Sequence, residues 1–301
     1  MKLLSIIIVT YNSEKDIYDC LDSIKRYSDI NAEELEIIVV DNNSSQAETM
    51  FKEIRHRFGH DILLIKNTQN GGYGQGNNTG IRKATAPVIL IMNPDVRLME
   101  PIFQTALQAF ESDNRLGIYG MKQMLASNIP SSNSFGCTYM MNGYLATILT
   151  AFGNRTDTYF PRCMHFSGSC FFIRKQMFEQ IGLFDEENFM YGEEDDINYR
   201  MKQQFGICQK YNRHLHYIHL SQGRRPSLDY EKKLLDVAIV NNEKKGYPRR
   251  KTIINRLRNA NMQYWREWVR VKMGKQDHAL FDVLLAYRQH LIQILNENDS
   301  L

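Results

Sequence analysis

A run of four carboxylates, Glu193-Glu194-Asp195-Asp196, is the densest group of acid–base side chains in the sequence. Crowding and partial burial raise the pKa values of such groups, so one of them could take a proton from a reacting hydroxyl. An acidic stretch is also typical of the first turn of a helix, where the helix dipole favours negative charge. Because consecutive helical residues point about 100° apart, the four carboxylates cannot all face one site.

Four further stretches are rich in Asn, Asp, Ser and Gly. They are Thr10-Tyr11-Asn12-Ser13, Asp41-Asn42-Asn43-Ser44-Ser45, the segment from Asn70 to Asn78, and Asn93-Pro94-Asp95. Any one of them could be explained by turn-forming and helix-capping residues. Three of them directly follow short apolar runs and one precedes a helix-like segment, which indicates that all four lie at one edge of a sheet.

The segments that must position these stretches alternate between two patterns. Short, β-rich apolar runs are typical of parallel strands covered on both faces, and helix-like segments lie between them. The expected strands are Leu4–Val9, Glu36–Val40, Ile62–Ile65 and Val88–Met92, and the expected helices are Glu14–Tyr27, Ser45–Phe58 and Gly74–Ala84. This alternation predicts an α/β fold with an open, doubly wound, Rossmann-like sheet, in which ligands bind beyond the carboxyl ends of the strands.

The composition of the 301-residue chain excludes several classes of protein. Hydrophobic residues make up 43% and charged residues 24%, as in an ordinary globular enzyme, and the net charge of +3 is too small to indicate nucleic-acid binding. Five cysteines without a CxxC pair argue against a disulfide framework and a zinc site. The apolar stretch before Thr10 is too short for a signal peptide, and no later run is long enough to span a membrane, so we expect a cytoplasmic protein.

Seven stretches, in their order and spacing, resemble glycosyltransferase family 2, particularly its rhamnosyltransferase-like bacterial branch. They are "SIIIVTYN", "IIVVDNNSS", "NGGYGQGNNTGI", "ILIMNPDV", "FSGSCFFIRKQMFEQIGLFDE", "FMYGEEDDINYR" and "HYIHLSQG". The resemblance covers roughly residues 3–224 and implies a GT-A fold with a mixed sheet. It also implies an inverting hexosyl- or rhamnosyltransferase that acts on a glycan or lipid-linked acceptor in bacterial surface polysaccharide synthesis.

The resemblance implies a nucleotide-sugar site beyond the strand ends. Asp41 would accept a hydrogen bond from the base, although its position also suits a helix cap. Glycines such as Gly72 would allow close backbone approach, and Gly168 would leave room for substrate or simply pack a strand. The residues implied to bind the UDP- or dTDP-linked donor are Thr10, Tyr11, Asn12, Asp41, Asn43, Gly72, Tyr73, Asn77, Asn93, Gly168 and Ser169.

Asn93-Pro94-Asp95 matches the DxD motif of the family, with Asn93 in place of the first Asp. Mg²⁺ or Mn²⁺ prefers oxygen ligands, and one carboxylate with substrate phosphates is a common way to hold Mg²⁺. The resemblance implies that Asp95 and His219 bind this cation, although a lone His is more often structural.

The same resemblance makes the acidic cluster the catalytic motif. It aligns Glu194 with the general base of the family, with Asp195 as the alternative one residue further on and Asp196 in the same motif.

The C-terminal helices interleave basic and apolar residues and contain both tryptophans, Trp265 and Trp268. This pattern suits peripheral contact with the cytoplasmic face of the inner membrane or a helical partner, and a helix packed on the catalytic domain is the commoner alternative. We expect a catalytic domain over residues 1–226, with a nucleotide-binding half (1–114) and an acceptor-binding half (115–226), and a basic helical region over 227–301. A homo-oligomer is left open.

Other functions are less well supported. A dinucleotide-binding dehydrogenase needs GxGxxG, and Asn77 stands where the last glycine would follow Gly72 and Gly74. A nucleotidyltransferase would be expected to have a glycine-rich loop with a basic residue after the first strand, which the stretch from Thr10 to Glu14 lacks. A carbohydrate-binding protein on a decayed enzyme fold would not be expected to keep its acidic residues.

Overall fold

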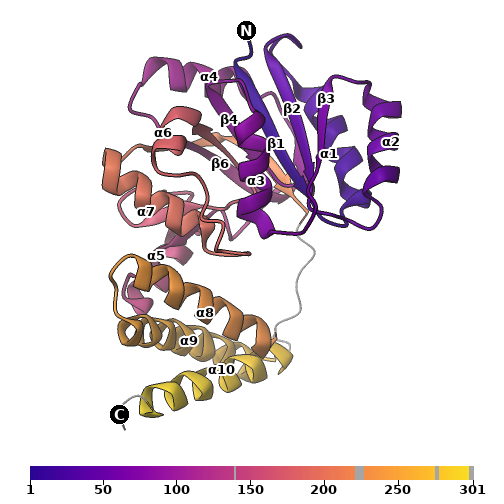
Figure 1. The fold of residues 1–301 in the computed structure, drawn as a ribbon. Coiled ribbons are helices and arrows are strands. Elements are labelled where there is room, and N and C mark those ends of the chain that lie inside the picture. The colour runs from indigo at the N-terminus through magenta and orange to yellow at the C-terminus, as the bar shows by residue number, and fades with distance from the viewer. Residues whose placement is uncertain (139, 221–226, 275–277, 298–301) are drawn as a thin grey trace. The chain divides into compact units, whose positions relative to one another are not determined.

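The computed structural model describes residues 1–138, 140–220, 227–274 and 278–297 (Figure 1). The chain forms two compact units, of which unit 1 comprises residues 1–135 and 166–221 and unit 2 comprises residues 136–165 and 222–301. The chain leaves and re-enters unit 1 through β8 (Phe135–Cys137) and β9 (Met164–Phe166), which pair with each other. The domain boundaries expected at residues 114 and 226 stay predictions, and the second lies outside the described residues, as do the last three residues of "HYIHLSQG".

The first part of unit 1 alternates strands and helices as predicted. Its elements are β1 (Leu4–Thr10), α1 (Glu14–Tyr27), β2 (Leu35–Asp41), α2 (Ala47–Phe58), β3 (Ile62–Lys66), α3 (Gly72–Lys83) and β4 (Val88–Met92). The strands are parallel, in the order β3-β2-β1-β4. The predicted α/β class and doubly wound arrangement are therefore confirmed.

Burial explains why these segments form a sheet with helices packed on it. All five residues of β4 and all but one of β1 are buried, so their apolar runs are removed from water on both faces. Helix α3 approaches the strands closely through its glycines, since a Cβ at Gly76 would lie 2.6 Å from Val9 and one at Gly80 would lie 2.6 Å from Ile7. This packing outweighs the poor helix propensity of glycine, and α3 begins at Gly72, two residues earlier than predicted.

The second part of unit 1 extends the sheet with strands of both directions. Its elements are β5 (Val96–Leu98), α4 (Phe103–Ser112), β6 (Ile118–Ala126), β7 (Ile129–Pro130), β10 (Cys170–Arg174), α6 (Lys175–Gln180), α7 (Glu193–Phe205) and β11 (Gln209–His219). Beyond β4 the order continues β10-β6-β11-β5, with β7 beside β6. Strand β10 is antiparallel to β4 and β6, while β11 is parallel to β6 and antiparallel to β5.

This topology brings several strand ends to one edge of the sheet. The last residues of β1 and β2, Thr10 and Asp41, lie opposite each other. Because β10 is antiparallel to β4, with Cys170 opposite Met92, the residues before β10 reach the same edge as those after β4. The convergence of strand-end loops expected from the sequence is confirmed for these strands.

Unit 2 is helical. It contains α5 (Gly143–Thr156), α8 (Leu228–Lys244), α9 (Arg249–Lys272) and α10 (His278–Glu297). Its buried core consists of Leu235, Ile239, Ile253, Ala260, Tyr287 and Leu291. In the portion of the chain that is described, no helix is both long and apolar enough to cross a bilayer.

Three long elements within residues 115–225 were not predicted from the sequence. This region contains the nine-residue β6, the 14-residue α5 and the 11-residue β11. Helix α5 has few strong helix formers, but the side chain of Asn142 caps its N-terminus by accepting a hydrogen bond from the Tyr144 N–H at 3.1 Å. A Cβ at Gly143 would lie 1.9 Å from the Asn255 carbonyl oxygen. Helix α5 is therefore stabilised by tertiary packing, which helix propensity does not predict.

Candidate functional site

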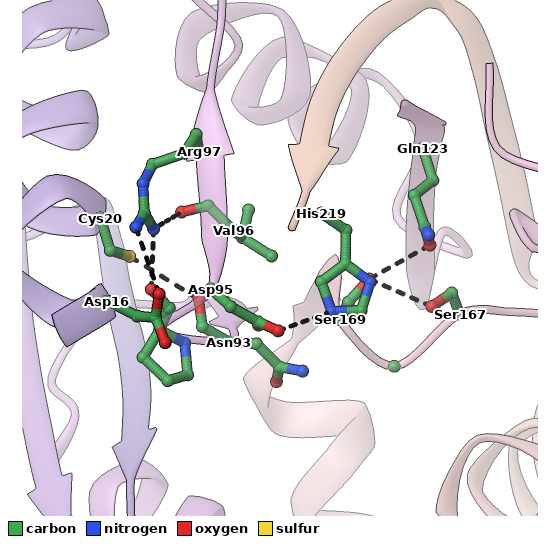
Figure 2. A network of polar contacts seen from close by, with 12 residues as sticks. Asp16, Cys20, Asn93, Asp95, Val96, Arg97, Gln123, Ser167, Ser169 and His219 are labelled. Carbon is green, nitrogen blue, oxygen red and sulfur yellow. Dashed lines mark hydrogen bonds and ion pairs between the residues drawn. The ribbon is translucent and has the colours of Figure 1, made fainter. Parts of the chain in front are cut away.

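Asp95 and His219 meet where β5 begins and β11 ends. Val96, the first residue of β5, lies opposite His219, and the carbonyl of Asp95 accepts a hydrogen bond from the Leu220 N–H at 2.9 Å. The Nε2 atom of His219 lies 3.3 Å from Oδ2 of Asp95 (Figure 2). The pairing of two strands thus joins the two side chains that the sequence analysis assigns to a cation.

The carboxyl group of Asp95 is partly open to solvent, with 31% of its side chain exposed. Burial raises its pKa, but the hydrogen bond and charge of His219, together with a backbone hydrogen bond and the charge of Arg97, outweigh burial and hold the pKa below its usual value. Asp95 is therefore ionised at neutral pH and presents a negative charge at the sheet edge.

Asp95 and His219 fit a divalent cation that is completed by substrate. Adjacent ligands of an octahedral ion with bonds of about 2.1 Å lie about 3 Å apart, close to the 3.3 Å between Oδ2 of Asp95 and Nε2 of His219. Among the described residues, no group of three or more His, Cys, Asp or Glu side chains could hold a metal ion. Diphosphate oxygens would have to supply the remaining ligands, as they commonly do for Mg²⁺.

Arg97 stabilises the turn that carries Asp95, although it was not predicted from the sequence. Its Nη1 atom donates to the carbonyls of Pro94 and Val96, both at 2.8 Å, and its Nη2 atom lies 3.8 Å from the Asp16 carboxylate (Figure 2). Only 12% of the side chain is exposed. The signal in the sequence was a basic residue two positions after Asn93-Pro94-Asp95. A guanidinium group that becomes buried needs several acceptors, and the backbone carbonyls of this turn supply them.

The segment Gly168-Ser169, just before β10, contacts both the Asn93-Pro94-Asp95 turn and Glu194. The carbonyl of Ser169 accepts a hydrogen bond from the Asn93 N–H at 2.8 Å. The N–H of Gly168 donates to Oε1 of Glu194 at 2.9 Å. A Cβ at position 168 would lie 2.2 Å from this carboxylate oxygen, so only glycine allows the contact. Asn93, Gly168, Ser169 and Glu194 are therefore brought together.

The four acidic residues at the start of α7 differ in their surroundings. Asp195 is 2% exposed, and Asp196, 9% exposed, pairs with Arg200 through an Oδ2–Nη2 distance of 2.5 Å. Glu194 is only partly buried and carries the Gly168 contact. As expected, the helix points the four side chains in different directions. Glu194 is the member of the cluster that is both accessible and held in position by a hydrogen bond.

Glu193 is buried and has a carboxylate oxygen without a hydrogen-bond partner among the described residues. The residue is 4% exposed, and the oxygen is Oε1. Burial, followed by the charge of Glu194, raises the pKa of Glu193 well above its usual value. The sequence does not predict a role for Glu193, because the burial of this side chain depends on how α7 packs.

A buried hydroxyl network supports the segment before β10. The hydroxyl of Ser169 lies 3.1 Å from the Ser167 hydroxyl and 3.4 Å from Oε1 of Gln123 (Figure 2). It also lies 2.9 Å from the Tyr217 hydroxyl. Gln123 lies on β6 and Tyr217 on β11. Gln123 and Tyr217 were not predicted from the sequence, since neither belongs to a recognisable motif and only strand pairing brings them here.

Thr10 and Asp41 anchor the ends of β1 and β2. Both are fully buried, and Oδ2 of Asp41 accepts from the hydroxyls of Thr10 at 3.0 Å and Ser44 at 2.5 Å. Oδ1 of Asp41 accepts from the Ser44 N–H at 2.8 Å, and the Asn12 N–H donates to the Ser44 hydroxyl at 2.8 Å. These contacts order both loops, and the contact of Asp41 with a nucleobase stays a prediction.

Tyr11 and Asn43 lie at the exposed rim of the same loops. The Tyr11 side chain is 52% exposed, and Asn43 is exposed with a φ of 64°. Asn12 also has a positive φ, of 50°. Asn is among the residues that adopt this conformation most readily, so the turns explain these residue types in part, and their nucleotide-binding roles stay predictions.

The start of α3 packs against the loop that leads to α7. A Cβ at Gly72, whose φ is +85°, would lie 1.9 Å from the Phe189 carbonyl oxygen, and the Tyr73 N–H donates to that oxygen at 3.0 Å. The Tyr73 hydroxyl donates to the Gly168 carbonyl at 2.6 Å, and the buried Asn77 donates to the Tyr73 carbonyl at 3.0 Å. Tyr73 thus contacts Gly168, the residue that also binds Glu194. Gly72 and Asn77 instead contact the protein backbone.

A Rossmann-like mixed sheet with a DxD-like turn and an acidic helix start at one edge defines the chain as a GT-A type nucleotide-diphospho-sugar transferase fold. The model of the family "Glycosyl transferase family 2" matches residues 5–182. The chain belongs to glycosyltransferase family 2.

Known proteins of this kind are similar to parts of the chain. The low-salt glycan biosynthesis hexosyltransferase Agl10 of Haloferax volcanii is 32% identical over 217 residues, which cover 68% of this chain and 64% of that protein. The teichoic acid poly(glycerol phosphate) polymerase of Staphylococcus epidermidis is 28% identical over 118 residues, or 38% of this chain and 16% of that protein. The chain therefore spans less than two thirds of the length of these curated relatives.

Among solved structures, the S. aureus TarS 1–349 complex with UDP aligns with a TM-score of 0.55 and 17% identity, covering 88% of this chain and 71% of that one. The mannosyltransferase PcManGT from Pyrobaculum calidifontis, in complex with GDP-Man and Mn²⁺, aligns with a TM-score of 0.58 and 14% identity, covering 99% and 79%. At these identities the likeness establishes the fold alone.

Proposed function

We propose that this protein is an inverting glycosyltransferase that moves a hexosyl or rhamnosyl group from a UDP- or dTDP-linked sugar. The acceptor is the hydroxyl of a glycan or lipid-linked glycan in bacterial surface polysaccharide synthesis. The observation that carries the proposal is the segment Gly168-Ser169, which hydrogen-bonds on one side to the Asn93-Pro94-Asp95 turn and on the other to Glu194. Donor diphosphate and acceptor hydroxyl would then meet at one short backbone segment.

In the proposed reaction the acceptor oxygen attacks the anomeric carbon while the bond from that carbon to the diphosphate oxygen breaks. Glu194 takes the proton of the acceptor hydroxyl, and the electron pair of the broken bond leaves with the nucleoside diphosphate. The Gly168 N–H holds Oε1 of Glu194 in place, while Oε2 remains to receive the proton. In-line attack opposite the leaving group inverts the anomeric configuration.

Asp95 and His219 would hold the divalent cation against the diphosphate. Mg²⁺ or Mn²⁺ would supply positive charge that stabilises the leaving nucleoside diphosphate. The low pKa of Asp95 keeps this ligand ionised across the neutral range. The Mn²⁺ complex of the Pyrobaculum mannosyltransferase supports this choice of metal.

The identity of the relatives supports the acceptor class. Agl10 is named as a hexosyltransferase of glycan biosynthesis, and TarS as a poly(ribitol-phosphate) β-N-acetylglucosaminyltransferase. Peripheral contact with the cytoplasmic membrane face would place the enzyme near a lipid-linked acceptor, and assembly as a homo-oligomer is compatible with this function.

A panel of donors tests the proposal most directly. UDP- and dTDP-linked rhamnose, galactose, glucose and N-acetylhexosamine are incubated with the protein and Mn²⁺, and release of nucleoside diphosphate is measured. We expect release from at least one donor, loss of that activity in excess EDTA, and its near-complete loss in Asp95→Ala. Full activity in EDTA would remove the metal assignment, and no release from any donor would contradict the proposed activity.

A further inference from the structure

The apolar side chains of α9 fall into two groups along the helix. In its first half, Ile253 and Ala260 lie in the buried core of unit 2 with residues of α8 and α10. In its last part, four large apolar side chains remain exposed. These are Trp265 (56% exposed), Trp268 (38%), Val269 (47%) and, directly after the helix, Met273 (58%).

The four exposed residues lie close together at the end of α9 and are here called the tryptophan ridge. Trp265, Val269 and Met273 follow one another at steps of four residues, and Trp268 lies three residues after Trp265, so all four lie on one side of the helix. The rings of Trp265 and Trp268 touch edge to face, with centroids 5.7 Å apart. The ridge therefore presents adjoining indole rings to solvent, which leaves a large apolar area unburied.

The ridge continues a row of α9 side chains that is covered nearer the start of the helix. Asn259 donates to the Thr147 hydroxyl on α5 at 2.8 Å, and Gly143 of α5 approaches the Asn255 backbone. Steps of three or four residues from Asn255 and Asn259 lead to Val269 and Met273, so these side chains lie in the same row. Helix α5 covers the start of the row and leaves its end open.

The exposed charge beside the ridge is positive. Helix α9 carries eight basic residues and one acidic residue, Glu267. That carboxylate is 1% exposed and lies 2.9 Å from Arg266 and 3.5 Å from Arg270, whose side chains are 59% and 48% exposed. The Lys272 ammonium group lies 5.8 Å from the centre of the Trp268 ring. A partner of this surface must be apolar in the middle and anionic around it.

We propose that the tryptophan ridge binds the surface of an anionic lipid bilayer. Trp side chains favour the boundary between acyl chains and headgroups, where Val269 and Met273 would also leave water. Arg266, Arg270 and Lys272 then reach the lipid phosphates while their aliphatic stems remain beside the apolar ridge. This inference does not depend on the proposed glycosyl transfer, because binding to lipid needs no donor.

Both tryptophans of the chain lie in the ridge, so intrinsic fluorescence reports on it directly. The full-length protein is titrated with vesicles of phosphatidylcholine containing about a third phosphatidylglycerol, and with vesicles of phosphatidylcholine alone. We expect a blue shift of the emission and quenching by brominated acyl chains with the anionic vesicles only. Each of Arg270→Gln and Lys272→Gln should weaken binding about fivefold, the equivalent of about 1 kcal/mol for one basic residue at an anionic surface.

Val269→Glu keeps both tryptophans and places a negative charge in the ridge. Its matched control is Val240→Glu on α8, because Val240 is a helical valine of similar exposure, 45% against 47% for Val269. Vesicle flotation should show at least a tenfold loss for Val269→Glu and none for Val240→Glu. Equal binding of both variants, or a blue shift that follows protein concentration without lipid and so indicates a second copy of the chain, would overturn the proposal.

Discussion

At the scale of single residues, the structure distinguishes the members of an acidic cluster that the sequence presents as four similar carboxylates. Glu194 is held by the Gly168 N–H at 2.9 Å, whereas Asp195 is 2% exposed and Asp196 is paired with Arg200. A base must reach the hydroxyl it deprotonates. This requirement favours Glu194, and the alternative one residue further on is left with little access.

Glu194→Gln should lower turnover by about 10²–10⁴-fold, the usual contribution of a general base. Gln keeps the volume and can still accept from the Gly168 N–H, but it cannot take a proton at neutral pH. The KM for the donor should change little, and steady-state kinetics with an active donor would measure both values. Asp195→Asn is the matched control, and a large loss of turnover there with none in Glu194→Gln would identify Asp195 as the base.

The pH dependence of stability should reveal the buried Glu193. Burial and the charge of Glu194 raise the pKa of Glu193 to about 8, while a Glu in an unfolded chain titrates near about 4.3. Between these values the folded protein binds more protons than the unfolded chain, so this group's contribution to stability falls as the pH rises.

Because Gln resembles the protonated acid, Glu193→Gln should leave Tm nearly unchanged at about pH 5 and raise it by a few degrees at about pH 9. Thermal melts across this range measure the difference between the variant and the unchanged protein. A gain in Tm that does not vary with pH would contradict the raised pKa.

At the scale of elements, glycines decide how closely α3 packs. Gly59 and Gly72 have nearly the same φ, +84° and +85°, but a Cβ at Gly59 would meet nothing within 4 Å, whereas one at Gly72 would lie 1.9 Å from the Phe189 carbonyl oxygen. A side chain at Gly59 would therefore meet backbone strain alone, whereas one at Gly72 would meet both backbone strain and a steric clash.

Gly59→Ala should cost about 1–3 kcal/mol of unfolding free energy through its backbone conformation. Gly72→Ala should cost clearly more, because α3 or the loop before α7 must also move. Urea unfolding of both variants gives the comparison. Equal losses would show that α3 does not rest on the Phe189 backbone in solution.

The sequence predicts the elements best where one physical pattern dominates. Helix α1 has the predicted bounds, Glu14 to Tyr27, because a regular apolar stripe and charged ends coincide there. Helix α5 was missed because its stabilising contact, Gly143 against α9, lies more than a hundred residues away in the chain. The pairing of Asp95 with His219 was expected only from the family resemblance, while Arg97, Gln123 and Tyr217 depend on strand registry that no local motif encodes.

At the scale of the whole molecule, each unit has its own core. Leu291 belongs to the core of unit 2 and Leu90 to that of unit 1, and both are fully buried. Truncation of such a side chain to Ala costs about 2–5 kcal/mol. A loss of this size lowers the opening free energy of the unit that contains it.

Leu291→Ala should therefore speed amide hydrogen exchange in α8, α9 and α10 while β1, β2 and β4 keep their protection. Leu90→Ala is the matched variant and should give the reverse pattern. Exchange followed by mass spectrometry resolves both sets of peptides. A uniform loss of protection throughout the chain in either variant would show that the two units unfold together.

The dipeptide before β10 also determines where the chain tolerates changes in length. Consecutive Cα atoms are about 3.8 Å apart, and Gly168 and Ser169 are each fixed by a separate hydrogen bond, to Glu194 and to Asn93. One inserted residue would separate these two anchors by a full peptide unit, and a deletion would remove one of them. Natural relatives that share this site should therefore vary in length in other loops and keep this segment at a constant number of residues.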